Sequence, residues 1–305
     1  MSGSLLEIKK KINGVQNTRK ITKAMQLVAA SKMRQFQKRA VSARGFAWDL
    51  FKILESNLSE DDKSIYTEKR ESGKTIFVLY TSDKGLCGPL NSKIINGLFR
   101  SNKWKNFKED ERALITIGKK SQGFAKSNKI PVLEYFEGIP EKISNLDAIA
   151  VIEKIMEHWN GGDVKEVIFI APHYKNSFTF YPVMKTFLPL SLEAIKTNVN
   201  VEEELDTKEE EYGDKNTDNM NMIFEPSREE VLNQLYEDII RAMFIQSFLE
   251  LKASEYSSRM MAMQNATDSA DRITNDLKRI FNKTRQQSIT QEIAELIGAS
   301  MALAD

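Results

Sequence analysis

The C-terminal run from Pro226 to Ile297 constrains this chain more than any other stretch, because it contains no glycine and no second proline. These two residues are the strongest breakers of helix. A continuous helix over this run, rising about 1.5 Å per residue, would be roughly 100 Å long. Because that length far exceeds an ordinary globular helix, we expect this helix to need a long partner.

Two interleaved seven-residue series follow one side of the predicted helix. The first comprises Ala242, Leu249, Tyr256, Met263, Ala270, Leu277 and Thr284, and the second comprises Gln246, Ala253, Met260, Thr267, Thr274, Phe281 and Ser288. This is the spacing of a coiled-coil seam. Bulky residues alternate in it with small or hydroxyl residues, so a partner helix can approach closely. We interpret this stripe as packed core.

A second long helix is predicted from Leu5 to about Leu58, a segment that lacks proline. It would be roughly 80 Å long. Its apolar stripe begins with Leu5, Ile8, Ile12 and Val15 and resumes, after a polar gap, with Ile21, Met25 and Val28. Pairing the two long helices buries both stripes. The pairing is expected to be antiparallel, because a compact domain separates the helices in sequence.

Between the long helices the apolar period changes from that of helix to that of strand. Strands are predicted at 74–80, 113–117, 132–136 and 166–170, helices at 90–103, 119–128 and 144–159, and an edge or antiparallel strand at 178–187. Strands alternating with helices predict a small, mostly parallel, Rossmann-like α/β domain. The predicted fold class is therefore α/β with an antiparallel coiled coil of the two terminal helices.

The predicted organisation has four parts. They are an N-terminal coiled-coil helix at 1–58, the α/β domain at 74–195, an acidic loop and linker at 196–225, and a C-terminal coiled-coil helix at 226–305. The longest apolar runs, 76–80 and 167–171, are too short to cross a bilayer. The N-terminus also lacks the apolar core of a signal peptide. We therefore expect no membrane span.

Charge is unevenly distributed although 44 Lys and Arg nearly balance 43 Asp and Glu. Residues 1–45 carry eleven Lys and Arg with one acid, and residues 201–214 carry eight acids with one base. The basic side chains lie all around the N-terminal helix, so they form either a solvated face or a surface for an acidic partner: nucleic acid, anionic lipid or protein. Nucleic acid is disfavoured, because few aromatic residues are interleaved for base stacking.

No active site is predicted. The loop Ser82–Asn91 follows a strand and precedes a helix, as a phosphate-binding loop would, but lacks the Gly-Lys-Ser/Thr ending. We interpret it as a tight structural turn and Cys87 as a buried thiol. His158 is expected at a helix end and His173 in a turn. A single cysteine and two histidines argue against a structural zinc site, and no catalytic residue, cofactor or metal is expected.

Six stretches resemble the gamma subunit of F-type ATP synthases. They are Val15–Met25 (VQNTRKITKAM) with Val28–Met33 (VAASKM), Ser82–Gly88 (SDKGLCG), Arg259–Met263 (RMMAM), Ala266–Asp268 (ATD) and Asn282–Ala299 (NKTRQQSITQEIAELIGA). The resemblance spans essentially the whole chain in matching order. The cysteine pair of redox-controlled plant members is missing, since the chain has one Cys.

The resemblance implies a rotor. In this family the paired terminal helices stand inside a ring of three alpha and three beta subunits, and the α/β domain contacts the epsilon subunit and the membrane c-ring. Proton flow turns the c-ring and the shaft, which changes the affinities of the catalytic sites on the beta subunits. Membrane association is then expected only through the complex, at the cytoplasmic side of a bacterial inner membrane. The family-like motif begins near residue 7, without a transit extension.

The resemblance also implies site residues. The expected rotor–stator contacts are Lys20, Lys23, Met25, Arg285, Gln286 and Thr290, and Glu255 and Arg259 match positions tied to coupling. Two alternatives remain open. One is a coiled-coil protein with an α/β head that tethers partners without turning. The other is an enzyme that binds a small phosphate ligand at Ser82–Asn91.

Overall fold

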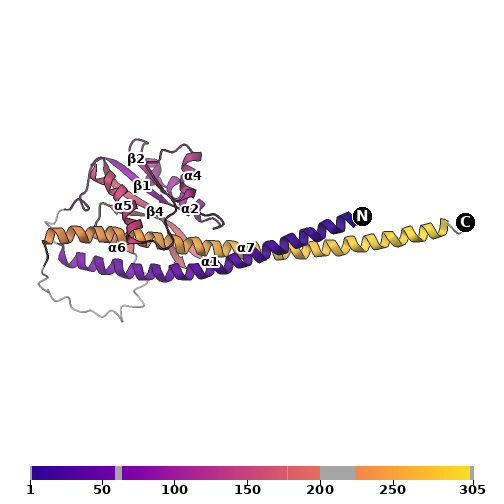
Figure 1. The fold of residues 1–305 in the computed structure, drawn as a ribbon. Coiled ribbons are helices and arrows are strands. Elements are labelled where there is room, and N and C mark those ends of the chain that lie inside the picture. Colours follow the sequence, from indigo (N-terminus) through magenta and orange to yellow (C-terminus); the bar gives the residue numbers. More distant parts are fainter. Residues whose placement is uncertain (1, 59–63, 177, 200–223, 303–305) are drawn as a thin grey trace. The chain divides into compact units, whose positions relative to one another are not determined.

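The computed structural model describes residues 2–58, 64–176, 178–199 and 224–302 (Figure 1). They form two compact units. The helical unit comprises 1–31 and 259–305, and the sheet unit comprises 32–258. Two long helices, α1 (Ser2–Asn57) and α7 (Arg228–Ala302), contribute a segment to each unit. Both helices were predicted, whereas residues 200–223 of the predicted acidic loop and linker at 196–225 lie outside the described residues.

Within the helical unit the two helices run antiparallel. Arg19 contacts Asp271, and Thr22 contacts Thr267, so the residue numbers of these two facing pairs add up to 290 and 289. Rising numbers on α1 therefore meet falling numbers on α7. The same order holds inside the sheet unit, where Phe36 stacks on Tyr256 with ring centroids 5.5 Å apart. The antiparallel pairing expected from the sequence is confirmed in each unit.

The predicted seam of α7 is confirmed in both units. In the sheet unit its members are buried, and in the helical unit they are buried or half-buried, none being exposed. Small residues bring the backbones close, and in the helical unit the Thr267 hydroxyl has hydrogen-bond partners both across and along the seam, whereas the buried Thr274 hydroxyl has none among the described residues. Thr267 is 3% exposed and donates its hydroxyl to the carbonyl of Met263, 2.8 Å away.

The predicted stripe of α1 is wrong in its middle. Ile21 and Val28 are 61% and 60% exposed, whereas Thr22 and Ala29 are 9% and 1% exposed. The buried residues continue along the helix through Met33, Phe36, Ala40, Ala47, Phe51 and Leu54, at steps of three, four or seven residues, as in a heptad seam. Hydrophobicity alone selected the wrong face, because the narrow seam favours small residues and a hydroxyl that is hydrogen-bonded.

The sheet unit contains a five-stranded sheet in the order β3-β2-β1-β4-β5. The first four strands are parallel: β1 (Lys74–Tyr80), β2 (Arg112–Ile117), β3 (Glu134–Phe136) and β4 (Val164–Asn176). β5 (Thr179–Leu188) pairs antiparallel with β4 at the edge. This mixed sheet agrees with the prediction of a mostly parallel domain with one antiparallel strand.

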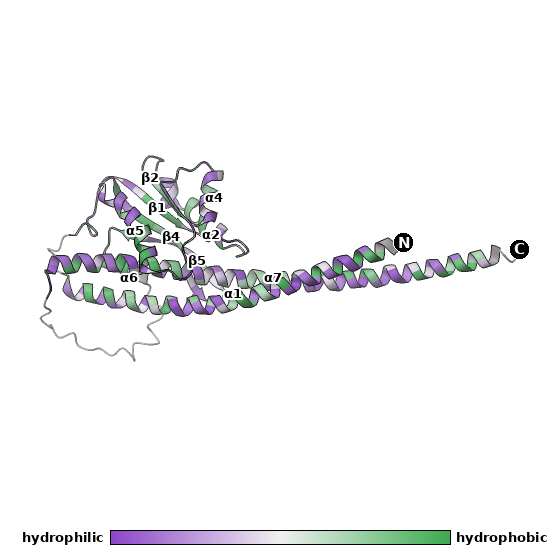
Figure 2. Cartoon of the chain, viewed as in Figure 1, coloured by the Kyte–Doolittle hydropathy of each residue, from purple (hydrophilic) through white to green (hydrophobic). Residues whose placement is uncertain are grey.

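Two aromatic clusters cover the two sides of β1. Phe77 contacts Trp104 on one side, with ring centroids 5.1 Å apart. On the other side Tyr80 stacks on Phe244 of α7 at 6.2 Å, and Phe169 of β4 meets the same ring at 5.9 Å. Figure 2 shows hydrophobic residues concentrated on these strands. The segment of α7 in the sheet unit is thus part of the core of this unit.

The remaining helices are α2 (Leu90–Phe99), α3 (Asn102–Asn106), α4 (Lys119–Ser127), α5 (Asn145–Asn160) and α6 (Leu192–Val199). Ser144 caps α5 through a capping box with Asp147, as its position predicts. The single helix predicted at 90–103 is in fact two, because Ser101 caps a new helix. α6 was not predicted. Its signal was Ser191, whose hydroxyl accepts from the amide of Ala194 at 3.0 Å.

Candidate functional site

The six predicted rotor–stator residues all lie in the helical unit. Lys20 and Lys23 are exposed on α1, and Arg285, Gln286 and Thr290 are exposed on α7. Met25 is half-buried. Five of the six side chains are therefore available to a partner, and the sixth lies at the margin of the helix seam.

A shallow groove of about 490 Å³ runs along one side of α7 near its C-terminal end. Its lining residues are Lys283, Gln286, Gln287, Thr290, Gln291 and Ala294. The structure thus brings Gln286 and Thr290 together on one face, since they are four residues apart and Thr290 donates its hydroxyl to the Gln286 carbonyl. Arg285 does not line this groove. Amide and hydroxyl groups here suit hydrogen bonding to a polar loop.

A polar layer joins α1 to α7 beside the predicted contacts. The guanidinium of Arg19 donates to the Asp271 carboxylate at 2.5 Å, and the hydroxyls of Thr22 and Thr267 are 2.8 Å apart. Gln26 donates to Gln264. Directional bonds at three successive levels fix the register of the two helices, which apolar contact alone specifies weakly. Arg19 therefore belongs to the helix pairing as well as to the basic surface.

The two residues expected from the resemblance to be tied to coupling are both buried. Glu255, in the sheet unit, is 3% exposed and accepts from Lys252 at 3.2 Å. Arg259, the first residue of the helical unit on α7, is 8% exposed. Burial of both charges is costly unless they are paired, so these positions serve the interior of the protein.

The loop Ser82–Asn91 is closed by its own hydrogen bonds. The Asn91 side chain accepts from the Ser82 amide at 3.0 Å and donates to the Cys87 sulfur at 3.2 Å. Ser258 donates to the Cys87 carbonyl at 2.5 Å, which ties the loop to α7. Cys87 is 2% exposed, so the prediction of a buried thiol is confirmed. The neighbouring cavity, about 10 Å³, has room for about one water molecule.

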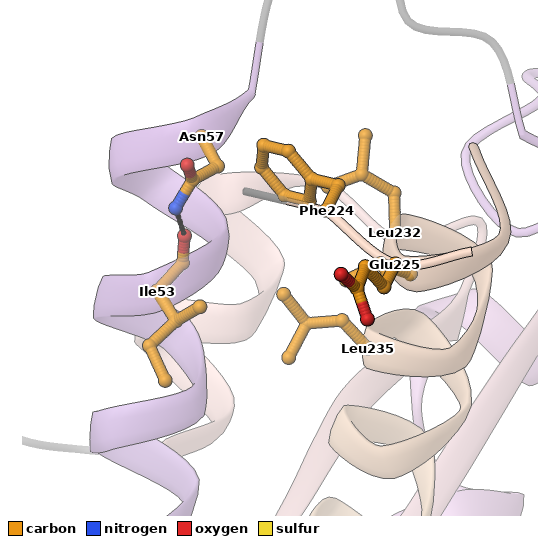
Figure 3. A pocket seen from close by; sticks show the side chains of 7 residues that line it. Ile53, Asn57, Phe224, Glu225, Leu232 and Leu235 are labelled. Atoms are coloured by element: carbon orange, nitrogen blue, oxygen red, sulfur yellow. Dashed lines mark hydrogen bonds between the residues drawn. The ribbon is translucent and has the colours of Figure 1, made fainter. Parts of the chain in front are cut away.

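An open pocket of about 560 Å³ lies where α1 ends and α7 begins, within the sheet unit (Figure 3). Ile53 and Asn57 come from α1, and Leu232 and Leu235 come from α7. Phe224 and Glu225 close it from the segment before α7, and Val231 completes the lining. The sequence did not predict this pocket, because its walls come from segments on opposite sides of the α/β domain in the chain.

A buried carboxylate in the sheet unit also escaped prediction. Glu250 of α7 is 2% exposed and meets the His173 ring, whose Nδ1 lies 2.9 Å from its oxygen. His173 lies in β4, so its predicted place in a turn is wrong: the strand continues past Pro172, which pairs with Pro182 of β5. The one available signal was an acid inside the apolar run Phe248–Leu251.

The described residues offer neither a metal site nor a membrane span. No group of three or more His, Cys, Asp or Glu among them is arranged to hold a metal ion. None of the described helices combines the length and the apolar character that crossing a membrane requires.

Comparison with known proteins identifies the family. A family model described as ATP synthase matches residues 4–303. An ATP synthase gamma chain of Polynucleobacter necessarius is 35% identical over 304 residues, covering 98% of this chain and 99% of that relative. The ATP synthase gamma chain of a Synechococcus strain is 33% identical, with 99% of each chain covered.

Solved structures agree with the sequence relatives. A chain from the central stalk and c-ring of the Tetrahymena thermophila mitochondrial ATP synthase superposes with a TM-score of 0.57 at 26% identity, covering 81% of this chain and 99% of that one. A chain of the Euglena gracilis mitochondrial ATP synthase has a TM-score of 0.66 at 18% identity, covering 99% of this chain and 95% of that one, which supports the fold alone. With sequence relatives matched over almost their full length, this chain belongs to the family of ATP synthase gamma chains.

Proposed function

We propose that this chain is the central rotor shaft of an F-type ATP synthase and couples proton flow through the c-ring to conformational cycling of the catalytic beta subunits. The gamma chain is a non-catalytic subunit of that complex. The observation that carries the proposal is the full-length match to gamma chains together with the antiparallel pair of terminal helices. A pair of helices resists bending where a single segment or a loop does not.

The end of α7 fits a bearing. Because facing positions add up to about 290, the start of α1 at Ser2 faces α7 near Ser288, and α7 continues alone to Ala302. On this unpaired stretch Ile289, Ile293 and Leu296 are 48%, 52% and 70% exposed. Exposed apolar residues of this kind mark a surface that another protein covers. The proposed partner is the ring of three alpha and three beta subunits.

The exposed cations of the helical unit suit a partner whose surface moves past the helices during rotation. Lys20 and Lys23 on α1 and Arg285 on α7 are long, flexible and exposed. Exposed ion pairs contribute only about 0–1 kcal/mol each, so contacts with acidic loops of the beta subunits can break and form again at every step. Gln286 and Thr290 are proposed to contact a beta-subunit loop, with Met25 at the level of the acidic loops.

The mechanism is mechanical linkage. A rotor orientation changes the affinity of a nucleotide site only if it stabilises the open and closed forms of that site differently. Membrane attachment is proposed to occur through the c-ring and the epsilon subunit, at the cytoplasmic side of a bacterial inner membrane, and the gamma chains of bacterial relatives support this placement. Nucleic acid is not among the proposed partners.

A rotation assay tests the proposal. The full chain is co-expressed with alpha and beta subunits of a bacterial relative, the complex is fixed through its beta subunits, and a bead is attached to the chain. ATP is expected to drive unidirectional rotation of the bead. A complex that assembles and hydrolyses ATP while the bead stays still would instead favour a tethering protein. A chain that fails to co-purify with alpha and beta would overturn the assignment of partners.

A further inference from the structure

The sheet unit contains a buried cluster of charged and polar side chains that the proposed contacts with other subunits do not use. This Glu250 cluster comprises Arg44 of α1, His173 of β4, Lys185 of β5, and Gln246 and Glu250 of α7. Its members come from four elements that are far apart in sequence. All four elements meet at one carboxylate.

Both oxygens of that carboxylate are engaged. Nδ1 of His173 lies 2.9 Å from Oε2, while the Gln246 side chain donates to Oε1 at 3.0 Å. The Arg44 guanidinium lies 3.5 Å from Oε1, and Lys185 adds a third basic group that attracts the carboxylate. The side chains of Arg44 and His173 are only 12% and 13% exposed. Little water can therefore replace these contacts.

His173 and Lys185, the two basic residues that the sheet contributes to the cluster, lie on the same face of the sheet. His173 and Phe169 are four residues apart on β4, so their side chains share a face, and Lys185 of β5 is the pairing partner of Phe169. That face receives α7, because Phe169 contacts Phe244 at 5.9 Å. Glu250 lies six residues further along α7, about 9 Å along the helix axis. The cluster thus sits beside the aromatic contact between sheet and helix.

The two kinds of contact have different physical consequences. Burial of apolar surface among Tyr80, Phe169 and Phe244 stabilises the packing, but this hydrophobic contribution is non-directional and tolerates small rotations or shifts of α7. A buried charge network is costly, and replacing it with apolar residues is often neutral or stabilising. Its attested use is to specify one register. The Glu250 cluster has that geometry, since one helix position satisfies partners on two strands and on α1.

We propose that Glu250 is a positioning residue that holds the sheet in one register against α1 and α7 within the sheet unit, so that torque applied to the sheet turns the helices without slip. The proposal rests on the proposed rotor function. In this proposal Glu250 acts through the residues that it aligns. A second set of polar contacts joins Glu141 to Lys32 and Tyr256. The Glu141 side chain is 35% exposed, so water screens these contacts more than those of Glu250.

The test uses three variants of the full chain. Glu250→Gln removes the charge and keeps the shape. Glu237→Gln is the matched control, because Glu237 lies on the same helix and accepts from Tyr66 and Arg241 but is 44% exposed. The triple variant Arg44→Met, Lys185→Met, Glu250→Met replaces the charged groups with apolar side chains. Because such replacements are often neutral or stabilising, this variant is expected to keep a thermal midpoint near that of the wild type.

Besides the thermal midpoint, two measurements are made on each variant. Hydrogen exchange of the full chain is expected to be about tenfold faster or more at β4 and β5 amides in Glu250→Gln, and less than about twofold faster in the control. In the complex assembled with alpha, beta, epsilon and the c-ring, protons pumped per ATP hydrolysed are expected to fall by about twofold or more in Glu250→Gln and in the triple variant. The control is expected to pump at the wild-type ratio.

The outcomes separate the two proposals. If the triple variant has a wild-type thermal midpoint and a wild-type pumping ratio, the cluster only fills space and the positioning role is overturned. Faster exchange in Glu250→Gln with an unchanged pumping ratio would also overturn it, while leaving the rotor function intact. If Glu250→Gln does not fold, the triple variant decides. A wild-type chain that assembles but supports no pumping would overturn the rotor function itself.

Discussion

The hydroxyl of Thr22 lies 2.8 Å from the hydroxyl of Thr267, across the seam between α1 and α7 in the helical unit. Both side chains are buried, and each hydroxyl also lies within hydrogen-bond distance of a carbonyl of its own helix, that of Arg19 and that of Met263 respectively. A hydroxyl pair at a position where a coiled coil usually places apolar residues lowers stability but marks the register. The pair therefore makes a testable contribution of its own.

We expect Thr22→Val to lower the free energy of unfolding by about 1 kcal/mol, because it leaves the Thr267 hydroxyl without its partner across the seam. The double variant Thr22→Val, Thr267→Val is expected to cost less than either single variant, because removing both hydroxyls leaves neither one without its partner across the seam. Urea unfolding of the full chain measures both. Thr18→Val, at an exposed hydroxyl, is the control. Strictly additive losses would argue against a direct hydroxyl bond.

Substituting Arg285 and Gln286 with alanine is expected to lower the ATPase turnover of the assembled complex severalfold, because both side chains are exposed where a beta-subunit loop is proposed to act. Nucleotide binding by isolated beta is expected to stay unchanged. Steady-state hydrolysis and a nucleotide titration measure the two quantities. Arg279→Ala is the control, since that side chain is 85% exposed and pairs only loosely with Asp276. Unaltered turnover would remove the proposed role.

Met25→Lys is expected to lower the number of protons pumped per ATP, because it adds a cation at a half-buried position beside the seam. Partial burial of the ammonium is costly, and an ion pair with an acidic residue of the stator would offset that cost. Such an ion pair would hold the rotor at one position. Proton pumping and ATP hydrolysis are measured on the same vesicles. Gln37→Lys, at an exposed position of α1, controls for added charge. A wild-type ratio for Met25→Lys would contradict the expectation.

Glu250 is expected to support stability through most of the acid range. Burial acts to raise the pKa of its carboxyl, but Lys185, His173 and Arg44 outweigh burial and lower that pKa to about 2. Because the pKa is lower in the folded state, the ionised carboxylate stabilises the folded protein fully at pH values above the ordinary pKa near 4.5. This stabilisation is lost as the pH falls toward 2. The contribution is on the order of 3 kcal/mol. The free energy of unfolding, measured in urea from about pH 6 to about pH 2.5, should therefore fall more steeply with falling pH for the wild type than for Glu250→Gln. Equal slopes would count against an ionised Glu250.

Lys185 works in the opposite direction. Burial lowers the pKa of its ammonium, although the attraction of Glu250 partly restores it. A lysine pKa below 10.5 in the folded state means that stability rises as the pH rises from that lowered value toward 10.5. Lys185→Met is expected to remove this alkaline rise in the same unfolding experiment. An alkaline rise that persists in Lys185→Met would assign it to another group.

Ser144→Ala is expected to lower the free energy of unfolding by about 1 kcal/mol, because it removes the cap of α5. The Ser144 hydroxyl accepts from the Asp147 amide at 3.2 Å, and the Asp147 carboxylate accepts from the Ser144 amide at 2.8 Å. Ser127→Ala, whose exposed hydroxyl bonds the Gly123 carbonyl within its own helix, serves as the control. Equal losses in the two variants would show that the capping box contributes nothing.

Local patterns predicted much of this fold. The two long helices follow from a scarcity of breakers, and the parallel strands follow from short apolar runs closed by turn residues. Boundaries failed where a single cap decides them: Ser101 divides one predicted helix into α2 and α3, and Ser191 starts α6. The exposed candidate residues were predicted from motifs, and their roles are proposals that the experiments above address.

The sequence by itself determined that α1 and α7 are long helices and which side of α7 is its seam, because seven-residue spacing is a property of the local chain. Only the tertiary structure decided that Thr22 and Ala29, rather than Ile21 and Val28, face the partner helix, since that choice depends on how closely the other backbone approaches. It also decided that His173 meets Glu250, 77 positions away. Periodicity records which residues share one face of one element, whereas contacts between elements depend on how their surfaces fit together.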